Sequence, residues 1–225
     1  MMLCLTMNVV RAEQVVVETR NTSLVLEVEK GKQPKYVYYG AKLSAQELAH
    51  LQLPRDGRME AYPAYGLNAP AEAALAMRHA DGNLSTALVC EGYEQGRVVD
   101  EGVATLHAAS AETMVTRITL KDPVYPVTVT LNYKAYVDED VIEAWTEIKN
   151  GEKQTVTLTT FASAMLPIRR GDVWLSHFYG SWANESRLVE EPLTPGQKVI
   201  VNKDGTRNSH TDHAEVMFSL DGKKL

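Results

Sequence analysis

The segment 127–137 reads VTVTLNYKAYV, and its apolar side chains recur at every second, odd-numbered position. Because neighbouring side chains of a strand point to opposite faces, this period predicts a β-strand with one buried and one solvated face. The same alternation occurs in residues 23–29 and 113–120. The inward positions predicted in those two segments are Leu24, Leu26, Val28, Met114, Ile118 and Leu120.

Further short apolar runs rich in β-branched residues are separated by turn signals such as Lys30-Gly31-Lys32 and Asp81-Gly82. Many short strands with hairpin punctuation and almost no helical period predict an all-β fold, a large antiparallel β-sandwich. No change of composition divides the chain, so we expect one domain over residues 13–225. The additional runs that predict strands are 13–19, 35–40, 73–80, 85–93, 141–148, 154–166, 172–180, 197–202 and 214–220.

One short helix is expected near residues 45–52. Ser44 and Glu47 have the spacing of a capping box, and Leu43 and Leu48 have that of a hydrophobic staple. An irregular loop from Arg55 to Ala71 follows, and loops of this length in compact domains are functional or lie at interfaces.

Residues 1–12, MMLCLTMNVVRA, are mostly apolar and end in the small residue Ala12. This pattern is typical of the end of a secretory signal peptide and predicts a periplasmic or secreted protein. An ordinary first strand is the alternative. After cleavage behind Ala12, Cys90 would be the one remaining cysteine, and its β-like surroundings favour a packing role.

Charge and composition exclude several classes of function. The net charge is −6, whereas a surface that binds nucleic acid needs an excess of Lys and Arg. No run of 18 apolar residues is present, so no membrane-spanning segment is predicted. A glycine-rich phosphate loop and a nucleophile elbow are also absent from the sequence, and we expect no cofactor.

Two groups of polar residues resemble catalytic or metal sites. His210, Asp212 and His213 lie within four residues and could bind a divalent metal, but a solvated turn explains them better, so we expect no metal site. Glu190 and Glu191 are adjacent and would point to opposite faces of a strand, which does not give the facing pair of a glycosidase. Residues 138–140 fit a charged hairpin tip.

Trp182 stands in the segment HFYGSWANE, among small and polar residues. A flat apolar ring beside Asn184 and Glu185 is suited to a sugar, whose apolar face stacks on the ring while its hydroxyl groups bond to the amide and the carboxylate. This argument is generic for an exposed tryptophan on a β-sandwich.

The ordered set of segments resembles the amino-terminal region of the family 36 glycoside hydrolases, the microbial α-galactosidases. The most specific pieces are EAYPAYG at residues 60–66 and HFYGSWANE at residues 177–185, the second of which resembles the family pattern His-Leu-x-Gly-x-Trp-x-Arg-Glu. The resemblance covers nearly all of residues 13–222. Asn184 replaces the arginine of the pattern.

The resemblance implies a β-supersandwich that packs against a downstream (β/α)₈ barrel, which carries both catalytic aspartates of a retaining enzyme. This chain would then contain no catalytic residue. The implied substrate is a terminal α-galactoside of the melibiose or raffinose type, and the implied assembly is a homo-oligomer. Trp182 corresponds to the substrate-contacting tryptophan, and Asp56 is the nearest match to a pocket aspartate.

Two other interpretations remain open at this stage. The chain could be a stand-alone carbohydrate-binding module, or a structural and oligomerisation domain in which the loop from Arg55 to Ala71 covers a partner. For Trp182, the alternative to a pocket wall is packing at the interface between the sandwich and the barrel.

Overall fold

A computed structural model describes residues 12–52, 59–66, 72–98, 113–168, 172–202 and 211–224. The chain divides into two compact units, unit 1 up to Pro167 and unit 2 from Ile168 onward, and each is described by itself. The single domain expected over residues 13–225 stays a prediction. In the described ranges, no helix combines the length and the apolar character that crossing a membrane requires.

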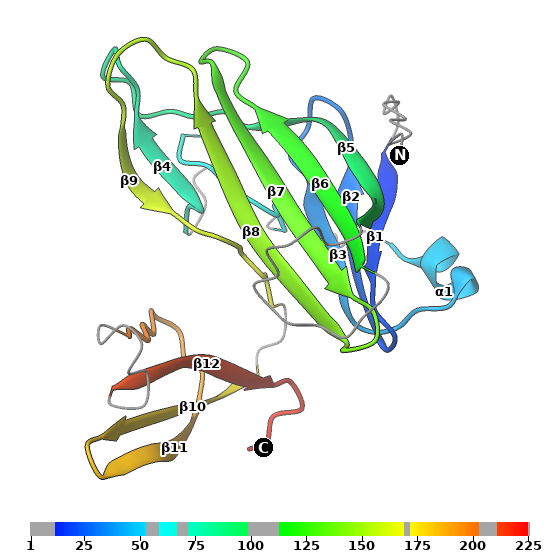
Figure 1. The fold of residues 1–225 in the computed structure, drawn as a ribbon, viewed down its shortest axis with the longest axis vertical. Coiled ribbons are helices and arrows are strands. Elements are labelled where there is room, and N and C mark those ends of the chain that lie inside the picture. Colours follow the sequence, from blue (N-terminus) through cyan, green and yellow to red (C-terminus); the bar gives the residue numbers. More distant parts are fainter. Residues whose placement is uncertain are drawn as a thin grey trace. The chain divides into compact units, whose positions relative to one another are not determined.

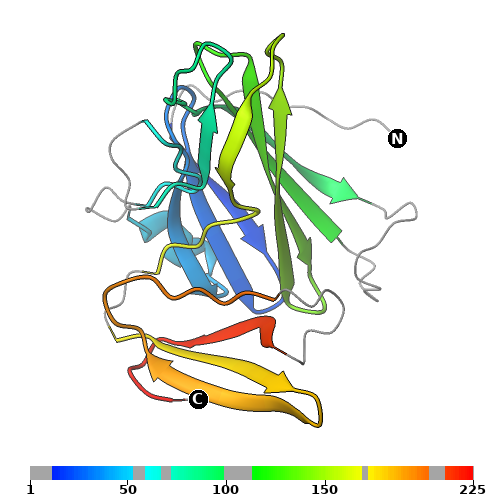
Figure 2. The same cartoon turned by 90° about the vertical axis from the view of Figure 1, so that its left-hand side faces the viewer.

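Unit 1 is built from three antiparallel sheets with the strand orders β1-β2-β3, β5-β6-β7-β8 and β4-β9. Figures 1 and 2 show the first sheet stacked on the second, which confirms the predicted antiparallel β-sandwich. The strands are β1 (Glu13–Glu18), β2 (Thr22–Val28), β3 (Lys35–Ala41), β4 (Leu75–Arg78), β5 (Val89–Val98), β6 (Thr113–Lys121), β7 (Val127–Tyr136), β8 (Val141–Asn150) and β9 (Thr157–Phe161).

The core of unit 1 lies between these sheets and contains the positions that the alternation predicts. Leu24, Leu26, Val28, Ile118 and Leu120 are buried, and Met114 packs half-buried against them. The odd positions of β7 from Val127 to Ala135 are buried as well.

The even face of β7 differs from the prediction of a solvated face. Thr128 and Thr130 are half-buried, but Asn132 and Lys134 are buried. The strand lies between β6 and β8, so long side chains from both neighbours crowd its outer face.

Helix α1 (Ala45–His50) begins with the predicted capping box. The Ser44 hydroxyl accepts from the Glu47 amide at 3.3 Å, and the Glu47 carboxylate accepts from the Ser44 amide at 2.8 Å. These bonds satisfy backbone donors that the first turn leaves free. The helix ends at His50 rather than at residue 52.

The segment Met59–Gly66, which holds the EAYPAYG motif, runs through the interior of unit 1. It bonds to β3 through Met59 and to β4 through Tyr65, and the Tyr62 hydroxyl donates to the carbonyl of Ala162 at 2.9 Å. Residues 59 and 61–64 are apolar and almost all buried. This part of the loop therefore belongs to the core and is not an apolar surface for a partner.

Unit 2 contains one antiparallel sheet with the order β11-β10-β12 (Figure 1). Its strands are β10 (Trp174–Ser181), β11 (Asn184–Pro192) and β12 (Asp212–Ser219).

The strand predictions fail at three places. Residues 197–202 form no strand, because an apolar alternation needs a neighbouring strand to receive its hydrogen bonds. The run 154–166 shortens to β9. Strand β11 was not predicted, since its first residues are polar and exposed on both faces and carry no alternation.

Candidate functional site

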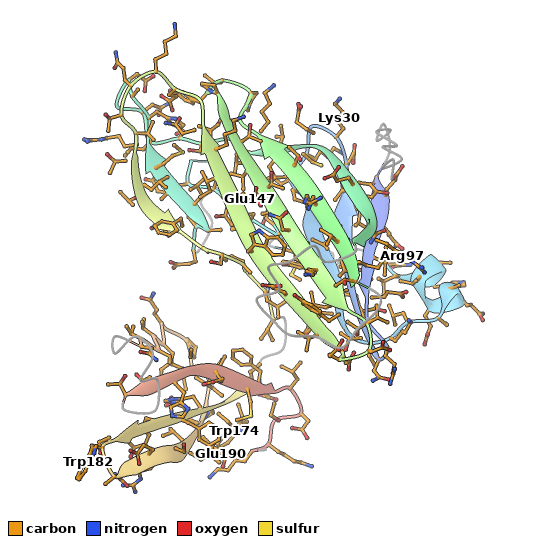
Figure 3. The ribbon with its side chains drawn as sticks, viewed as in Figure 1. Lys30, Arg97, Glu147, Trp174, Trp182 and Glu190 are labelled. Carbon is orange, nitrogen blue, oxygen red and sulfur yellow. The ribbon has the colours of Figure 1, made fainter. Side chains whose placement is uncertain are left out.

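Strands β10 and β11 form a hairpin whose tip carries Trp182. Ser181 pairs with Asn184, so Trp182 and Ala183 make the two-residue turn. Figure 3 shows Trp182 at this end of the hairpin. The side chain of Trp182 is 82% exposed, more than any other large apolar residue in the described part of the chain. The sequence therefore places its largest flat apolar surface on an open tip.

The backbone of the tip is strained. Ala183 has φ = 59°, in the left-handed region that costs a non-glycine residue about 1–2 kcal/mol. The Ala183 amide donates to the Glu185 carboxylate at 3.1 Å, which helps to hold the turn. A positive φ is the geometry that a two-residue hairpin turn requires, so the left-handed backbone of Ala183 follows from the tight turn that presents Trp182.

Polar residues follow Trp182 along the chain. Asn184 and Glu185 begin β11, and both are exposed. Behind them, the Arg187 guanidinium lies 5.9 Å from the ring centroid of Tyr179, its direct partner on β10. An exposed ring next to an amide and a carboxylate can stack on a sugar and bond to its hydroxyl groups.

The motif histidine, His177, lies within the sheet of unit 2. It is 4% exposed, and neither ring nitrogen has a hydrogen-bond partner. The Oδ1 atom of Asp212 lies 3.8 Å from His177 Nδ1. The same motif thus contributes a buried histidine and, five residues later, an exposed tryptophan.

The structure describes some of the remaining predicted site residues and leaves others out. Asp56 and His210 lie outside the described residues, as do residues 1–11 of the predicted signal peptide. Asp212 and His213 begin β12, and no group of three His, Cys, Asp or Glu side chains with metal-binding geometry occurs in the described ranges.

The neighbouring carboxylates of β11 have separate local partners. Glu190 is opposite Ser176, and Glu191 is opposite Leu175, so the two side chains occupy opposite faces of the sheet. The Lys198 ammonium lies 2.5 Å from Glu191 and holds the pKa of that carboxyl below its usual value. This arrangement confirms that they are not a facing glycosidase pair.

Residues 137–140 form the predicted hairpin tip between β7 and β8. Asp140 accepts hydrogen bonds from the Thr19 hydroxyl and from the Asn21 amide in the turn after β1. The hydrogen bond from Thr19 makes the largest contribution to the lowered pKa of the Asp140 carboxyl. The acidic tip therefore has a structural role within unit 1.

One polar cluster is not predicted from the sequence, because its members lie far apart in the chain. His79 Nδ1 lies 2.7 Å from Glu152, and His79 Nε2 lies 3.0 Å from the Thr86 hydroxyl, in the order of an acyl-transfer triad. Both His79 and Thr86 are buried, and the Tyr125 ring stacks on the imidazole at 3.5 Å. A substrate could not reach Thr86, so the cluster is structural.

Cys90 is buried, and burial raises the pKa of its thiol. A protonated, inaccessible thiol is a poor nucleophile. The packing role predicted for Cys90 agrees with this environment.

Residues 32–223 match the family described as "Glycosyl hydrolase family 36 N-terminal domain". A comparison with curated protein sequences gives no match. Among solved structures, the α-galactosidase from Lactobacillus brevis has a TM-score of 0.78 at 20% identity, over 95% of this chain and 32% of that chain.

The galactosidase domain of an α-galactosidase–sucrose kinase has a TM-score of 0.75 at 24% identity, over 93% of this chain and 32% of that chain. An α-galactosidase from Geobacillus stearothermophilus, solved in complex with raffinose, has a TM-score of 0.72 at 21% identity, over 91% and 31% of the two chains. The chain thus spans about a third of the length of these proteins, whose likeness shows the fold. Because the family match extends over most of the sequence, the chain belongs to the N-terminal domain family of glycosyl hydrolase family 36.

Proposed function

We propose that this chain is the non-catalytic N-terminal part of a retaining α-galactosidase that acts on terminal α-galactosides of the melibiose or raffinose type. The observation that carries the proposal is the position of Trp182, 82% exposed on the strained β10–β11 tip, in a chain of this family. The catalytic carboxylates would belong to a downstream (β/α)₈ barrel.

In this proposal the hairpin tip supplies one wall of the substrate pocket. The indole would stack on the apolar face of the galactose ring, and Asn184 would bond to a hydroxyl group. An exposed ring on a short, hydrogen-bonded turn loses little freedom on binding, which favours such a role. Asp56 is proposed as a second pocket residue, and the assembly of subunits is proposed as a homo-oligomer.

The first experiment reads the coding DNA beyond the codon for Leu225. A continuation of several hundred codons with a repeating βα pattern supports the proposal. In that complete enzyme, Trp182→Ala should raise KM for raffinose about fivefold or more, since an aromatic wall of a packed pocket contributes about 1–3 kcal/mol. Unchanged KM with normal folding would remove Trp182 from the pocket and leave packing against the barrel as its role.

A stand-alone carbohydrate-binding module is the second candidate, because the exposed Trp182 is open to a ligand in this chain by itself. If a stop codon follows Leu225, this candidate becomes the better one. It requires that raffinose change the tryptophan fluorescence of the wild-type chain and not that of Trp182→Ala.

Periplasmic location or secretion is proposed on residues 1–12 alone. Amino-terminal sequencing of the protein from its native host tests it. A mature chain that starts at Glu13 supports export, and a chain that retains Met1 contradicts it.

A further inference from the structure

The outer face of the β5–β8 sheet in unit 1 carries a complete row of functional side chains. Register pairs Glu94 with Arg117, Arg117 with Asn132, and Asn132 with Trp145, one residue from each strand. Residues paired in this way lie side by side on one face, with Cβ atoms about 5 Å apart. The row thus combines an ion pair, an amide and an indole.

Asn132 is the unusual member of this row. It is 1% exposed, and its Nδ2 donates at 3.3 Å both to the Thr130 carbonyl and to the Glu147 carboxylate. Its Oδ1 is buried without a hydrogen-bond partner. A buried acceptor without a donor destabilises a fold, and most such groups in proteins are satisfied. The position therefore has an unused acceptor at the centre of a sheet.

Trp145 is half-buried beside it and makes one hydrogen bond through its indole nitrogen. The indole Nε1 donates to Glu147 at 3.2 Å, and Glu147 is the same carboxylate that accepts from Asn132. Figure 3 shows Glu147 on the outer surface of β8. One exposed carboxylate thus orients both the ring and the amide.

The next row on the same face has mostly small side chains. It consists of Gly92, Thr119, Thr130 and Glu147 in register. Gly92, Thr119 and Thr130 are small, and Glu147 is the one long side chain of this row. The hydroxyl groups of the two threonines add donors and acceptors to this face, and Thr130 lies on the strand next to that of Trp145.

Arg117 is the neighbour of Asn132 that can move. Its guanidinium bonds to Glu94 at 3.1 Å, and the two side chains are 41% and 35% exposed. Such surface ion pairs contribute little free energy, so their rearrangement costs little. Displacement of Arg117 toward solvent would give a ligand hydroxyl access to Asn132 Oδ1.

We propose that this face binds a neutral saccharide, with one sugar ring on Trp145 and a hydroxyl group that donates to Asn132 Oδ1. Glu147 and Arg117 bond to further hydroxyl groups. The ligand is neutral because both signs of charge are present and the Arg117 guanidinium is already paired with Glu94. The site lies in unit 1, and the proposal does not depend on the role of Trp182.

The test is an NMR titration of the 225-residue chain with raffinose, using ¹⁵N-labelled protein. The expected result is a saturable shift of the Trp145 indole and Asn132 side-chain signals, with weak affinity. Trp145→Ala and Asn132→Val should each weaken binding at least about tenfold. Thr128→Val, on the same strand and face but four residues away, is the matched control and should bind like wild type.

Thermal unfolding separates a ligand role from a structural role. Asn132→Val removes the unpaired acceptor, so its melting temperature should equal or exceed that of the wild type while binding is lost. A clearly lower melting temperature with raffinose binding retained would make Asn132 structural and overturn the proposal.

Two further outcomes would also overturn it. If Trp182→Ala abolishes the raffinose response and Trp145→Ala does not, the sugar binds to the hairpin tip. If sulfate shifts the Trp145 and Asn132 signals and raffinose does not, the face binds anions. Binding that survives Trp182→Ala but not Trp145→Ala supports the proposal, whatever the kinetics of a complete galactosidase reveal about Trp182.

Discussion

The two units bury their apolar side chains to very different extents. Unit 1 has sheets on two sides of a core, and every residue of the main buried cluster lies in it. In its described residues, unit 2 has one sheet, and many of its large apolar residues are exposed, although Val173 and Leu175 are buried. In that unit the exposed ones are Ile168, Tyr179, Trp182, Leu188, Val199, Val201, Val216, Met217, Phe218 and Leu220.

The difference in burial implies that the two units have different requirements for folding. A β-sheet becomes stable when it buries one face against another layer, and unit 1 contains both layers. A sheet without a second layer is expected to need a covering surface. Unit 2 therefore has the features of an interface element, whereas unit 1 has those of a self-sufficient sandwich.

Thermal unfolding of each unit as a separate fragment tests the difference in burial, and we expect the largest effect in this experiment. A fragment of residues 12–167 should unfold cooperatively with heat, and a fragment of residues 168–225 should lack a melting transition, because it cannot bury enough apolar area. Circular dichroism of the two fragments is the measurement. A cooperative transition in the second fragment alone would refute the contrast.

Two leucines, one in each unit, test the difference in burial through single substitutions. Leu26→Ala, at a fully buried position of β2, should lower the free energy of unfolding by about 2–5 kcal/mol through the cavity it creates. Leu188→Ala, at a 51% exposed position of β11, should change it by less than about 0.5 kcal/mol. Urea denaturation of the full chain measures both. Equal costs would mean that Leu188 is packed in solution.

The sequence predicts unit 1 better than unit 2 for the same physical reason. Period-two alternation arises where one face of a strand is buried, as in β2, β6 and β7. Strand β11 is exposed on both faces along most of its length, so its sequence is free of that constraint. Residues 197–202 show the reverse error, because they have the alternation without a paired strand.

The candidate sites differ in the same way. Trp182 is recognisable because an aromatic ring among Gly180, Asn184 and Glu185 stands out locally in the sequence. The Glu94–Arg117–Asn132–Trp145 row depends on strand register, and the His79–Glu152 contact joins the segments that follow β4 and β8. Both bring together residues far apart in the chain. Local patterns predict strands, but register across four strands has to be observed.

Acid sensitivity should reside mainly in unit 1. The pKa of Glu152 is lowered, first by its bond to His79, so the stability it contributes is complete above its ordinary pKa of about 4.3 and is lost as pH falls through the lowered value. We expect the melting temperature to decrease when the pH is lowered below about 4, and this decrease should be smaller in Glu152→Gln. Glu191→Gln, whose carboxylate pairs with an exposed lysine, should change the pH profile less.

The smallest effect concerns the turns of the two units. The turn at Gly82 in unit 1 has a glycine at φ = 91°, whereas the β10–β11 tip in unit 2 has Ala183 at φ = 59°. Ala183→Gly should therefore stabilise the chain by up to about 1 kcal/mol, and Gly82→Ala should destabilise it by about 1 kcal/mol. A Cβ at Gly82 would meet no atom within 4 Å, so that cost is purely conformational.

Thermal unfolding compares the two variants. Opposite signs would show that the Trp182 turn holds strain that glycine relieves, and a loss of stability in Ala183→Gly would mean that the alanine is unstrained there.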